Sequence, residues 1–274
     1  MIEENNSFDR FLFYDEKEIH MTDIEYCVDR ILMFPKIRPH QLEKAIALAY
    51  QYCKKSDFRR IILENINQCP VLIYRLYKRG VFVFEEIEPC LRFDNSFLLC
   101  YYFMEEIEDF QSFIQRKNRP FDFDESFFRN TNDINHLIQY GFLPQSLEYC
   151  LKYDVIDELV GFNIMNQKAK WSPFEWSMKQ KSLDLLAFSG FFGSIKCFKH
   201  LLLKGFEIDG NARSMVVCSG CLDLLHLCQV QQFLTSECVC KASEFFHLPI
   251  LVYFFENGSD INAKDKDVVF LCSI

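Results

Sequence analysis

The chain has 274 residues and a formal net charge of −9, and half of its residues are hydrophobic. This length suits two ordinary domains or one elongated array of repeats. The acidic balance argues against nucleic-acid binding, which needs concentrated Lys and Arg. The longest apolar run covers eight residues, 97–104, against the roughly 20 that a membrane-spanning helix needs. We therefore expect no membrane insertion, and we interpret this run as a buried helix.

Apolar residues recur at helical spacing near the N-terminus, over residues 24–32 and again over residues 42–50. Alternation of the kind that marks a β-strand is hard to find anywhere in the chain. Thr22 and Ser146 precede apolar runs at positions suited to helix N-caps. The sequence therefore predicts an all-α fold.

Two segments in the middle of the chain share a longer pattern. Leu76–Gly80 is followed by Ile87–Asp94, and Leu137–Gly141 is followed by Leu147–Asp154. Both read Leu-x-x-x-Gly and then, after a turn, apolar-Glu-x-Cys-Leu-basic-aromatic-Asp. A Gly suits a helix C-terminus because it closes the last turn in the left-handed conformation without steric cost. We interpret the pattern as degenerate helix pairs running from about residue 60; chance recurrence of a short motif is the alternative.

The C-terminal third contains three helix-turn-helix copies. They pair residues 184–193 with 194–205, residues 215–220 with 221–228, and residues 242–246 with 247–258. Gly193, Gly220 and Phe246 occupy the turn inside each pair. The segments Leu201–Asp209 and Tyr253–Asn262 end alike, with a short apolar helix, a Gly, and a finger that closes on Ile and Asp or Asn.

This pattern resembles the ankyrin repeat over about residues 182–263. Thr-Pro is missing at the start of each first helix, Phe246 and Gln232 replace glycines, and spacings of about 27 and 26 residues fall short of the roughly 33 that is usual. The Phe-rich and Cys-rich style resembles divergent ankyrin proteins expanded in unicellular eukaryotes. The resemblance implies a helical-repeat solenoid with ankyrin-like repeats in residues 126–274. Residues 1–125 would form a helical N-terminal region, partly of degenerate repeats.

Ankyrin repeats stack into a continuous core with a concave groove that binds other proteins. The resemblance therefore implies a non-enzymatic protein–protein interaction module whose partner is not specified. The alignment with the ankyrin pattern places the following residues at the groove: Phe191, Phe192, Phe206, Glu207, Glu244, Phe245, Ser259 and Asp260. Three of them, Phe191, Phe192 and Phe245, stand where the family usually has polar residues. Each ring is either a partner contact or a packing contact with a neighbouring repeat.

A structural subunit of a larger cytoskeletal or ciliary assembly is the alternative function. The 30 Phe residues and the apolar segment 267–274 favour it. That segment either folds back onto Phe254 and Phe255 or is covered by another protein. The acidic composition favours a reversible adaptor instead.

The 13 cysteines predict a reducing, cytoplasmic compartment, because the acidic start at residues 1–6 lacks the basic and apolar parts of a secretory signal. We expect buried free thiols such as Cys90, Cys150 and Cys197. Cys218, Cys221, Cys238 and Cys240, with His226 between them, are residue types that could bind zinc. The register spreads these residues over two repeats, so we expect no metal.

No phosphate-binding loop, dinucleotide fingerprint, nucleophile elbow or zinc-protease motif occurs in the chain. We therefore expect no enzymatic activity, no cofactor and no small-molecule substrate. The remaining enzymatic alternative is a Cys and a His that converge in a deep pocket.

Overall fold

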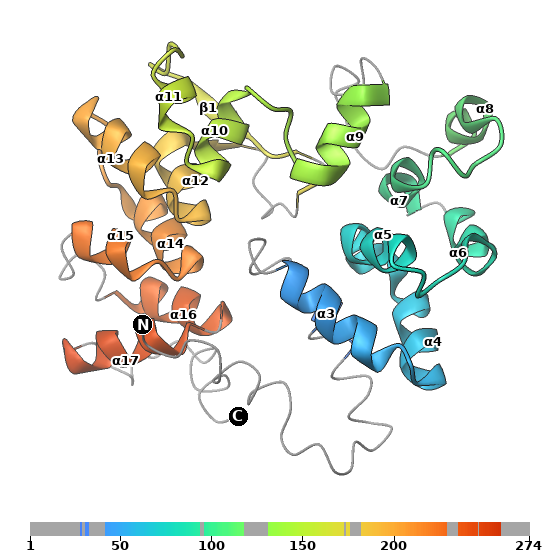
Figure 1. Cartoon of the computed structure of the whole chain (residues 1–274). Coiled ribbons are helices and arrows are strands. Elements are labelled where there is room, and N and C mark those ends of the chain that lie inside the picture. The colour runs from blue at the N-terminus through green and yellow to red at the C-terminus, as the bar shows by residue number, and fades with distance from the viewer. Residues whose placement is uncertain are drawn as a thin grey trace. The chain divides into compact units, whose positions relative to one another are not determined.

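The computed structural model describes residues 28, 31–32, 42–93, 96–117, 131–172, 174–175, 182–228, 235–245 and 247–258. These residues are mostly helical, with one small two-stranded sheet (Figure 1). The helical class expected from the sequence is confirmed, whereas the sheet was not expected. The chain divides into two compact units, Met1–Ile134 and Asn135–Ile274. The expected boundary between residues 125 and 126 lies outside the described residues.

The described part of unit 1 consists of short helices. Their bounds are α3 (Leu42–Tyr52), α4 (Ser56–Glu64), the 3-10 helix η2 (Ile66–Gln68), α5 (Pro70–Lys78), α6 (Phe84–Leu91), α7 (Phe97–Tyr102) and α8 (Phe110–Gln115). Helix α5 packs against both α3 and α7, and α6 packs against α7. The buried helix predicted within residues 97–104 is confirmed as α7, in which Phe97, Leu99, Cys100 and Tyr102 are buried.

The helix ends predicted from glycines are confirmed in both units. Helix α5 ends before Gly80 (φ 71°), where the N–H of Val81 donates to the oxygen of Leu76 at 3.0 Å. Helix α9 (Thr131–Tyr140), which crosses the boundary between the units, ends before Gly141 (φ 80°). Both glycines take the left-handed conformation that closes a helix. Helices α6 and α10 (Leu147–Tyr153) follow, as the shared pattern predicted.

Unit 2 holds the C-terminal helices and the sheet. The further bounds are α11 (Ile156–Leu159), β1 (Lys168–Lys170), β2 (Ser182–Asp184), α12 (Leu185–Phe192), α13 (Ile195–Leu203), α14 (Gly210–Ser219), α15 (Leu222–Leu227), α16 (Ser236–Glu244) and α17 (Leu248–Glu256). The strands are antiparallel, with Ala169 opposite Leu183. Each strand has three residues, too few for alternation to be recognised in the sequence.

The helices of unit 2 follow one another in space (Figure 1, yellow to red). Helix α12 packs against α10 and α14, and α14 packs against α16. Each of these helices also contacts the helix that follows it: α11, α13, α15 or α17. Helix α12 lies between two others, which explains why it is apolar nearly all round, with Leu185, Leu186, Phe188 and Phe191 buried.

In two of the helix pairs, the first helix begins earlier than the sequence alignment suggested. Helix α14 starts after Asp209, whose carboxylate accepts the N–H of Ala212 at 2.7 Å. Helix α16 starts after Thr235, whose hydroxyl accepts the N–H of Cys238 at 3.3 Å. These N-caps satisfy backbone donors that the helix itself leaves unpaired. Residues Gln232, Phe246 and 267–274, on which further expectations rested, lie outside the described residues.

No helix among the described residues combines the length and the apolar character needed to cross a bilayer.

Candidate functional site

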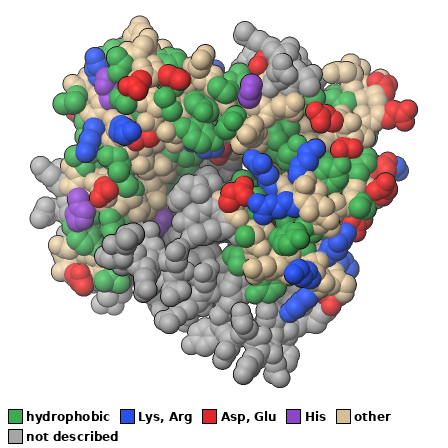
Figure 2. All heavy atoms as spheres, in the orientation of Figure 1, with side chains coloured by type: hydrophobic (Ala, Val, Ile, Leu, Met, Phe, Trp, Pro, Cys, Tyr) green, Lys and Arg blue, Asp and Glu red, His purple; other side chains and the backbone are tan. Residues whose placement is uncertain are grey.

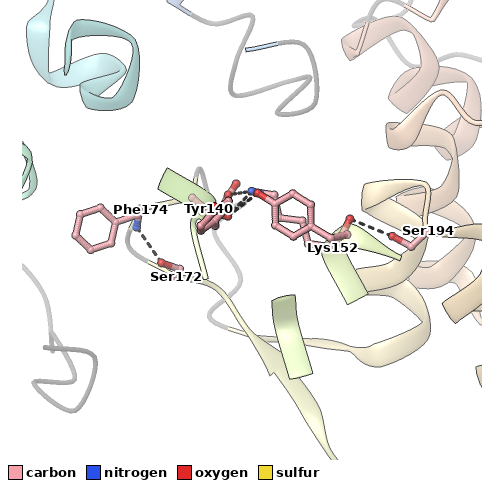
Figure 3. A network of polar contacts seen from close by, with 7 residues as sticks. Tyr140, Lys152, Ser172, Phe174 and Ser194 are labelled. Atoms are coloured by element: carbon pink, nitrogen blue, oxygen red, sulfur yellow. Dashed lines mark hydrogen bonds and ion pairs between the residues drawn. The ribbon is translucent and has the colours of Figure 1, made fainter. Parts of the chain in front are cut away.

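Lys152 on α10 is the centre of a polar network in unit 2 (Figure 3). Its Nζ donates to the backbone oxygen of Tyr140 at 2.8 Å and forms an ion pair with the carboxylate of Glu175. The two side chains are only 14% and 8% exposed. Removing both charges from water costs free energy, and the attraction between them does not offset this cost alone. Further contacts of the two side chains are therefore needed to stabilise the pair.

Three aromatic rings surround the same ammonium group. Lys152 Nζ lies 5.8 Å from the ring centroid of Phe142, 5.1 Å from that of Tyr153 and 5.7 Å from that of Phe192. An ammonium group within about 6 Å of a ring centroid is attracted by the electron-rich face of the ring. Lys152 is therefore stabilised by rings from three different segments as well as by Glu175.

The Glu175 carboxylate occupies a space that a glycine leaves open. A Cβ atom added at Gly141 would lie 1.9 Å from Glu175 Oε1, so no other residue fits there without displacing the carboxylate. Burial raises the pKa of Glu175, and the charge and hydrogen bond of Lys152 act in the opposite direction. Lys152 thus partly offsets the burial that disfavours the charged form of Glu175.

Glu175 is the last of four described residues that follow β1, namely Trp171, Ser172, Phe174 and Glu175, which we call the strap. The Ser172 hydroxyl accepts the N–H of Phe174 at 3.1 Å (Figure 3). Trp171 is buried, and its ring centroid lies 5.0 Å from that of Phe188 and 5.8 Å from that of Phe192. The strap therefore lies over one end of α12.

One polar atom of the strap is left without a partner. The indole Nε1 of Trp171 is buried and makes no hydrogen bond. A buried N–H group that lacks an acceptor loses the hydrogen bond it would make with water, which typically costs about 1–3 kcal/mol. The position of the strap thus combines good ring packing with an unsatisfied donor.

Polar side chains also join successive helix pairs. Ser194, which precedes α13, donates its hydroxyl to the carbonyl oxygen of Leu151 near the end of α10. The same hydroxyl lies 3.4 Å from the carbonyl oxygen of Lys152 (Figure 3). His247, which precedes α17, has its Nε2 2.8 Å from the carbonyl oxygen of Cys218 near the end of α14. A carbonyl oxygen only accepts, so His247 Nε2 carries the proton. Both contacts link a second helix to the first helix of the preceding pair.

The structure places two of the predicted groove residues in the core. Phe191 is 3% exposed and Phe245 is 1% exposed. Their ring centroids lie 6.4 Å apart, and that of Phe191 lies 5.3 Å from the ring centroid of Trp171. The packing alternative stated from the sequence accounts for both rings, because neither presents a surface that a partner could contact.

The other predicted groove residues have different environments. Phe192 and Phe206 are half-buried, whereas Glu207 and Glu244 are exposed. The N–H of Phe206 donates to the oxygen of Leu201 at 3.1 Å, which places this ring just after the turn that closes α13. Ser259 and Asp260 lie outside the described residues. Of the six predicted groove residues that the structure describes, four are therefore at least partly exposed.

Sequence reasoning did not single out Lys152, Glu175 or Trp171. One signal for Lys152 was present, because it is the basic residue in the pattern shared by residues 87–94 and 147–154. The partner of Lys152 could not be foreseen, since Glu175 lies 23 residues further along the chain and outside the repeat pattern.

Three of the buried cysteines are poorly suited to nucleophilic or metal chemistry. Burial raises the pKa of Cys53 and of Cys228 to about 12. Burial, followed by a hydrogen bond to Glu158, raises the pKa of Cys150 to about 11. Such thiols stay protonated at neutral pH, whereas the thiolate is the nucleophile and the metal ligand. Within the described part of the chain, no three His, Cys, Asp or Glu side chains form a group that could hold a metal ion.

No protein-family model, curated protein or solved structure matches this chain. Its function must therefore be inferred from its own residues.

Proposed function

We propose that unit 2 is a non-enzymatic protein–protein interaction module built from ankyrin-like helix pairs, with a partner protein bound in a concave groove. The observation that carries the proposal is the order in which the helices of unit 2 contact one another. Helices α10, α12, α14 and α16 contact one another in succession, and each contacts the helix that follows it. Stacked helix pairs of this kind bury a continuous core that no single pair could form alone.

The repeated junctions support the same interpretation. Ser194 and His247 each begin a second helix and each bond to a carbonyl group at the end of an earlier first helix. Cys221 begins α15 at the corresponding place, and its Cβ lies close to where a Cβ of Gly193 would be, at 3.6 Å. Equivalent contacts at equivalent positions are expected if the pairs are structural repeats.

The proposed partner surface is formed by those predicted groove residues that are at least partly exposed to solvent. Glu207 and Glu244 supply exposed charge, and Phe206 and Phe192 supply partly exposed rings. Rings combined with charged side chains are typical of protein interfaces. The buried free cysteines fit a reducing compartment such as the cytoplasm, and we place the activity there.

The test is recovery of partner proteins from cells that express the tagged full chain, by extraction in mild detergent and mass spectrometry. Glu244 and Glu256 can be compared because both are exposed glutamates at the last position of a helix, α16 and α17 respectively. Glu244 also forms an ion pair with Lys241 at 2.7 Å, so the Lys241→Met variant shows the effect of losing that pair alone. We expect Glu244→Lys to reduce recovery of a partner about tenfold. Glu256→Lys should leave recovery unchanged.

Equal recovery with both variants, and with Glu207→Lys and Phe206→Ala, would show that no partner contacts this surface. Far-UV circular dichroism and the melting temperature of each variant establish that the fold is intact. These controls separate a lost contact from a lost structure.

A structural subunit of a cytoskeletal or ciliary assembly is the second candidate. Apolar side chains are exposed on the second helices, with Leu203 on α13 at 88% and Leu248 and Val252 on α17 also exposed. Figure 2 shows hydrophobic side chains at the surface over α13 and α15. Permanent assemblies cover such surfaces. Retention in the insoluble cytoskeletal fraction at fixed stoichiometry, and release by Leu203→Glu, is expected for this candidate.

A further inference from the structure

The surface beneath the strap has a defined chemistry. Lys152 supplies an ammonium group for a carboxylate, and Gly141 leaves space for that carboxylate because it lacks a Cβ. Phe188 and Phe192 supply ring faces and edges for another aromatic ring. The surface therefore suits a segment that carries an aromatic ring and, a few residues later, a carboxylate.

The strap fits this surface, but not completely. The Trp171 N–H has no hydrogen-bond partner, although the indole ring itself packs closely. Burial raises the pKa of Glu175, which shows that its charged form is disfavoured there. Both groups would be hydrated if the strap left the surface, so its release restores interactions with water. The strap therefore combines an unpaired buried donor and a disfavoured charge with the buried rings of Trp171 and Phe174.

We propose that the strap is a displaceable occupant of an interaction surface formed by Gly141, Lys152, Phe188 and Phe192, and that a partner protein segment with an aromatic ring followed by a carboxylate replaces it. The proposal rests on the proposed function, because Phe192 belongs to the predicted groove. It adds the chemical nature of one partner segment. It also makes the strap an internal competitor that lowers the apparent affinity of every partner segment that must displace it.

The chain contains its own reporter for displacement. It has two tryptophans, Trp171 in the strap and Trp176. Trp176→Phe leaves Trp171 as the single indole, and its emission shifts to longer wavelength when the ring passes from an apolar site into water. The state of the strap can then be followed in the full chain without a label.

The probe is a synthetic peptide with the sequence of residues 171–175 and Phe in place of Trp171, which does not emit under indole excitation. It is titrated into the full chain carrying Trp176→Phe, with and without Glu175→Gln. We expect the Trp171 emission to shift and acrylamide quenching to increase as the peptide binds. Glu175→Gln removes the ionic anchor of the strap, so half-maximal displacement should need a peptide concentration about tenfold lower.

Two controls test the chemistry of the surface. A peptide with Gln in place of its final Glu should bind about tenfold more weakly to the chain that retains Lys152. With Lys152→Met, the two peptides should bind equally, because the ammonium group that distinguishes them is gone. Far-UV circular dichroism confirms that each variant is folded.

The proposal is overturned if Trp171 emission in the Glu175→Gln chain stays unchanged at millimolar peptide while urea shifts it. The strap would then be a fixed part of the core. This titration needs no cellular partner, so its failure is distinct from failure of the proposed function. Partners lost with Glu244→Lys, together with an unresponsive strap, would reject this inference alone.

Discussion

Arg59 and Glu86 form a two-point contact between α4 and α6. Arg59 Nε donates to Oε1 of Glu86 at 3.1 Å, and Arg59 Nη2 donates to Oε2 at 2.5 Å. The N–H of Val83 donates to the same Oε2 at 2.9 Å. Paired hydrogen bonds between a guanidinium and a carboxylate are stronger and more specific than single contacts. Glu86 therefore fixes the start of α6 against α4 in unit 1.

This contact predicts a pH dependence of stability. Burial acts to raise the pKa of Glu86, but the hydrogen bonds from Arg59 and Val83 and the charge of Arg59 outweigh it and lower the pKa below 4.5. A lowered folded-state pKa contributes stability that is fully present above the unfolded value and is lost as pH falls through the folded value. Glu86→Gln should cost about 1 kcal/mol at pH 7. The cost should vanish at the lowest pH at which the chain stays folded.

Urea denaturation of the full chain at several pH values measures this difference. Glu85→Gln is the control, because Glu85 is the exposed neighbouring residue on α6. A cost for Glu86→Gln that is the same at every pH would contradict the assigned cause.

A second prediction concerns the glycine beneath Glu175. Gly141 has φ of 80°, and a Cβ there would collide with the Glu175 carboxylate. Gly205 has φ of 90°, but nothing lies within 4 Å of its Cβ position. Gly205→Ala should therefore cost about 1 kcal/mol from backbone strain alone. Gly141→Ala should cost more, because the alanine also displaces Glu175 from Lys152.

A double-mutant cycle separates the free energy of this collision from that of the backbone strain. In a Glu175→Ala background, the cost of Gly141→Ala in unfolding free energy should fall to that of Gly205→Ala. If Gly141→Ala costs the same with and without the Glu175 carboxylate, the predicted collision does not occur.

A third prediction concerns the thiols. Cys53, Cys150 and Cys228 are buried, and burial raises the pKa of each thiol. Native protein at pH 8 should therefore label slowly at these three sites, since labelling needs both access and the thiolate. In guanidinium chloride all 13 cysteines should label quickly. Mass spectrometry of labelled peptides identifies each site, and rapid labelling of Cys150 in the native state would disprove the assignment.

The parts of the fold that were predictable from the sequence depend on local chemistry. Gly80, Gly141 and Gly193 marked helix ends because the left-handed turn that closes a helix selects glycine wherever it occurs. The starts of α14 and α16 were less predictable, since Asp209 and Thr235 cap helices that the repeat alignment began later, at residues 215 and 242. Local signals thus located the helices well and their first turns less well.

The site could be predicted only in part, because its contacts join distant residues. The sequence left Phe191 and Phe245 as either packing or binding residues, since an apolar ring at a helix end suits both roles. Both rings pack against neighbouring helices, and Phe191 also packs against Trp171, which lies outside the repeat pattern. The ion pair of Lys152 and Glu175 has no sequence signature at all, because it depends on where the strap lies.

The last prediction tests whether the helix pairs are equivalent. Ser194 and His247 bond to carbonyl groups of Leu151 and Cys218 at corresponding junctions. Ser194→Ala and His247→Ala each leave a buried carbonyl without that donor, which should cost about 1–3 kcal/mol of unfolding free energy. His200→Ala, on α13 and without such a contact, should cost less than about 0.5 kcal/mol.

Hydrogen exchange locates the effect of each variant. Ser194→Ala should speed exchange at the end of α10 and the start of α13, and His247→Ala should do so at the end of α14 and the start of α17. Local openings of this kind are expected because junction bonds hold only neighbouring pairs together. Exchange that rises equally throughout unit 2 would show that the unit opens as one block, and the junctions would then not be equivalent links between separate repeats.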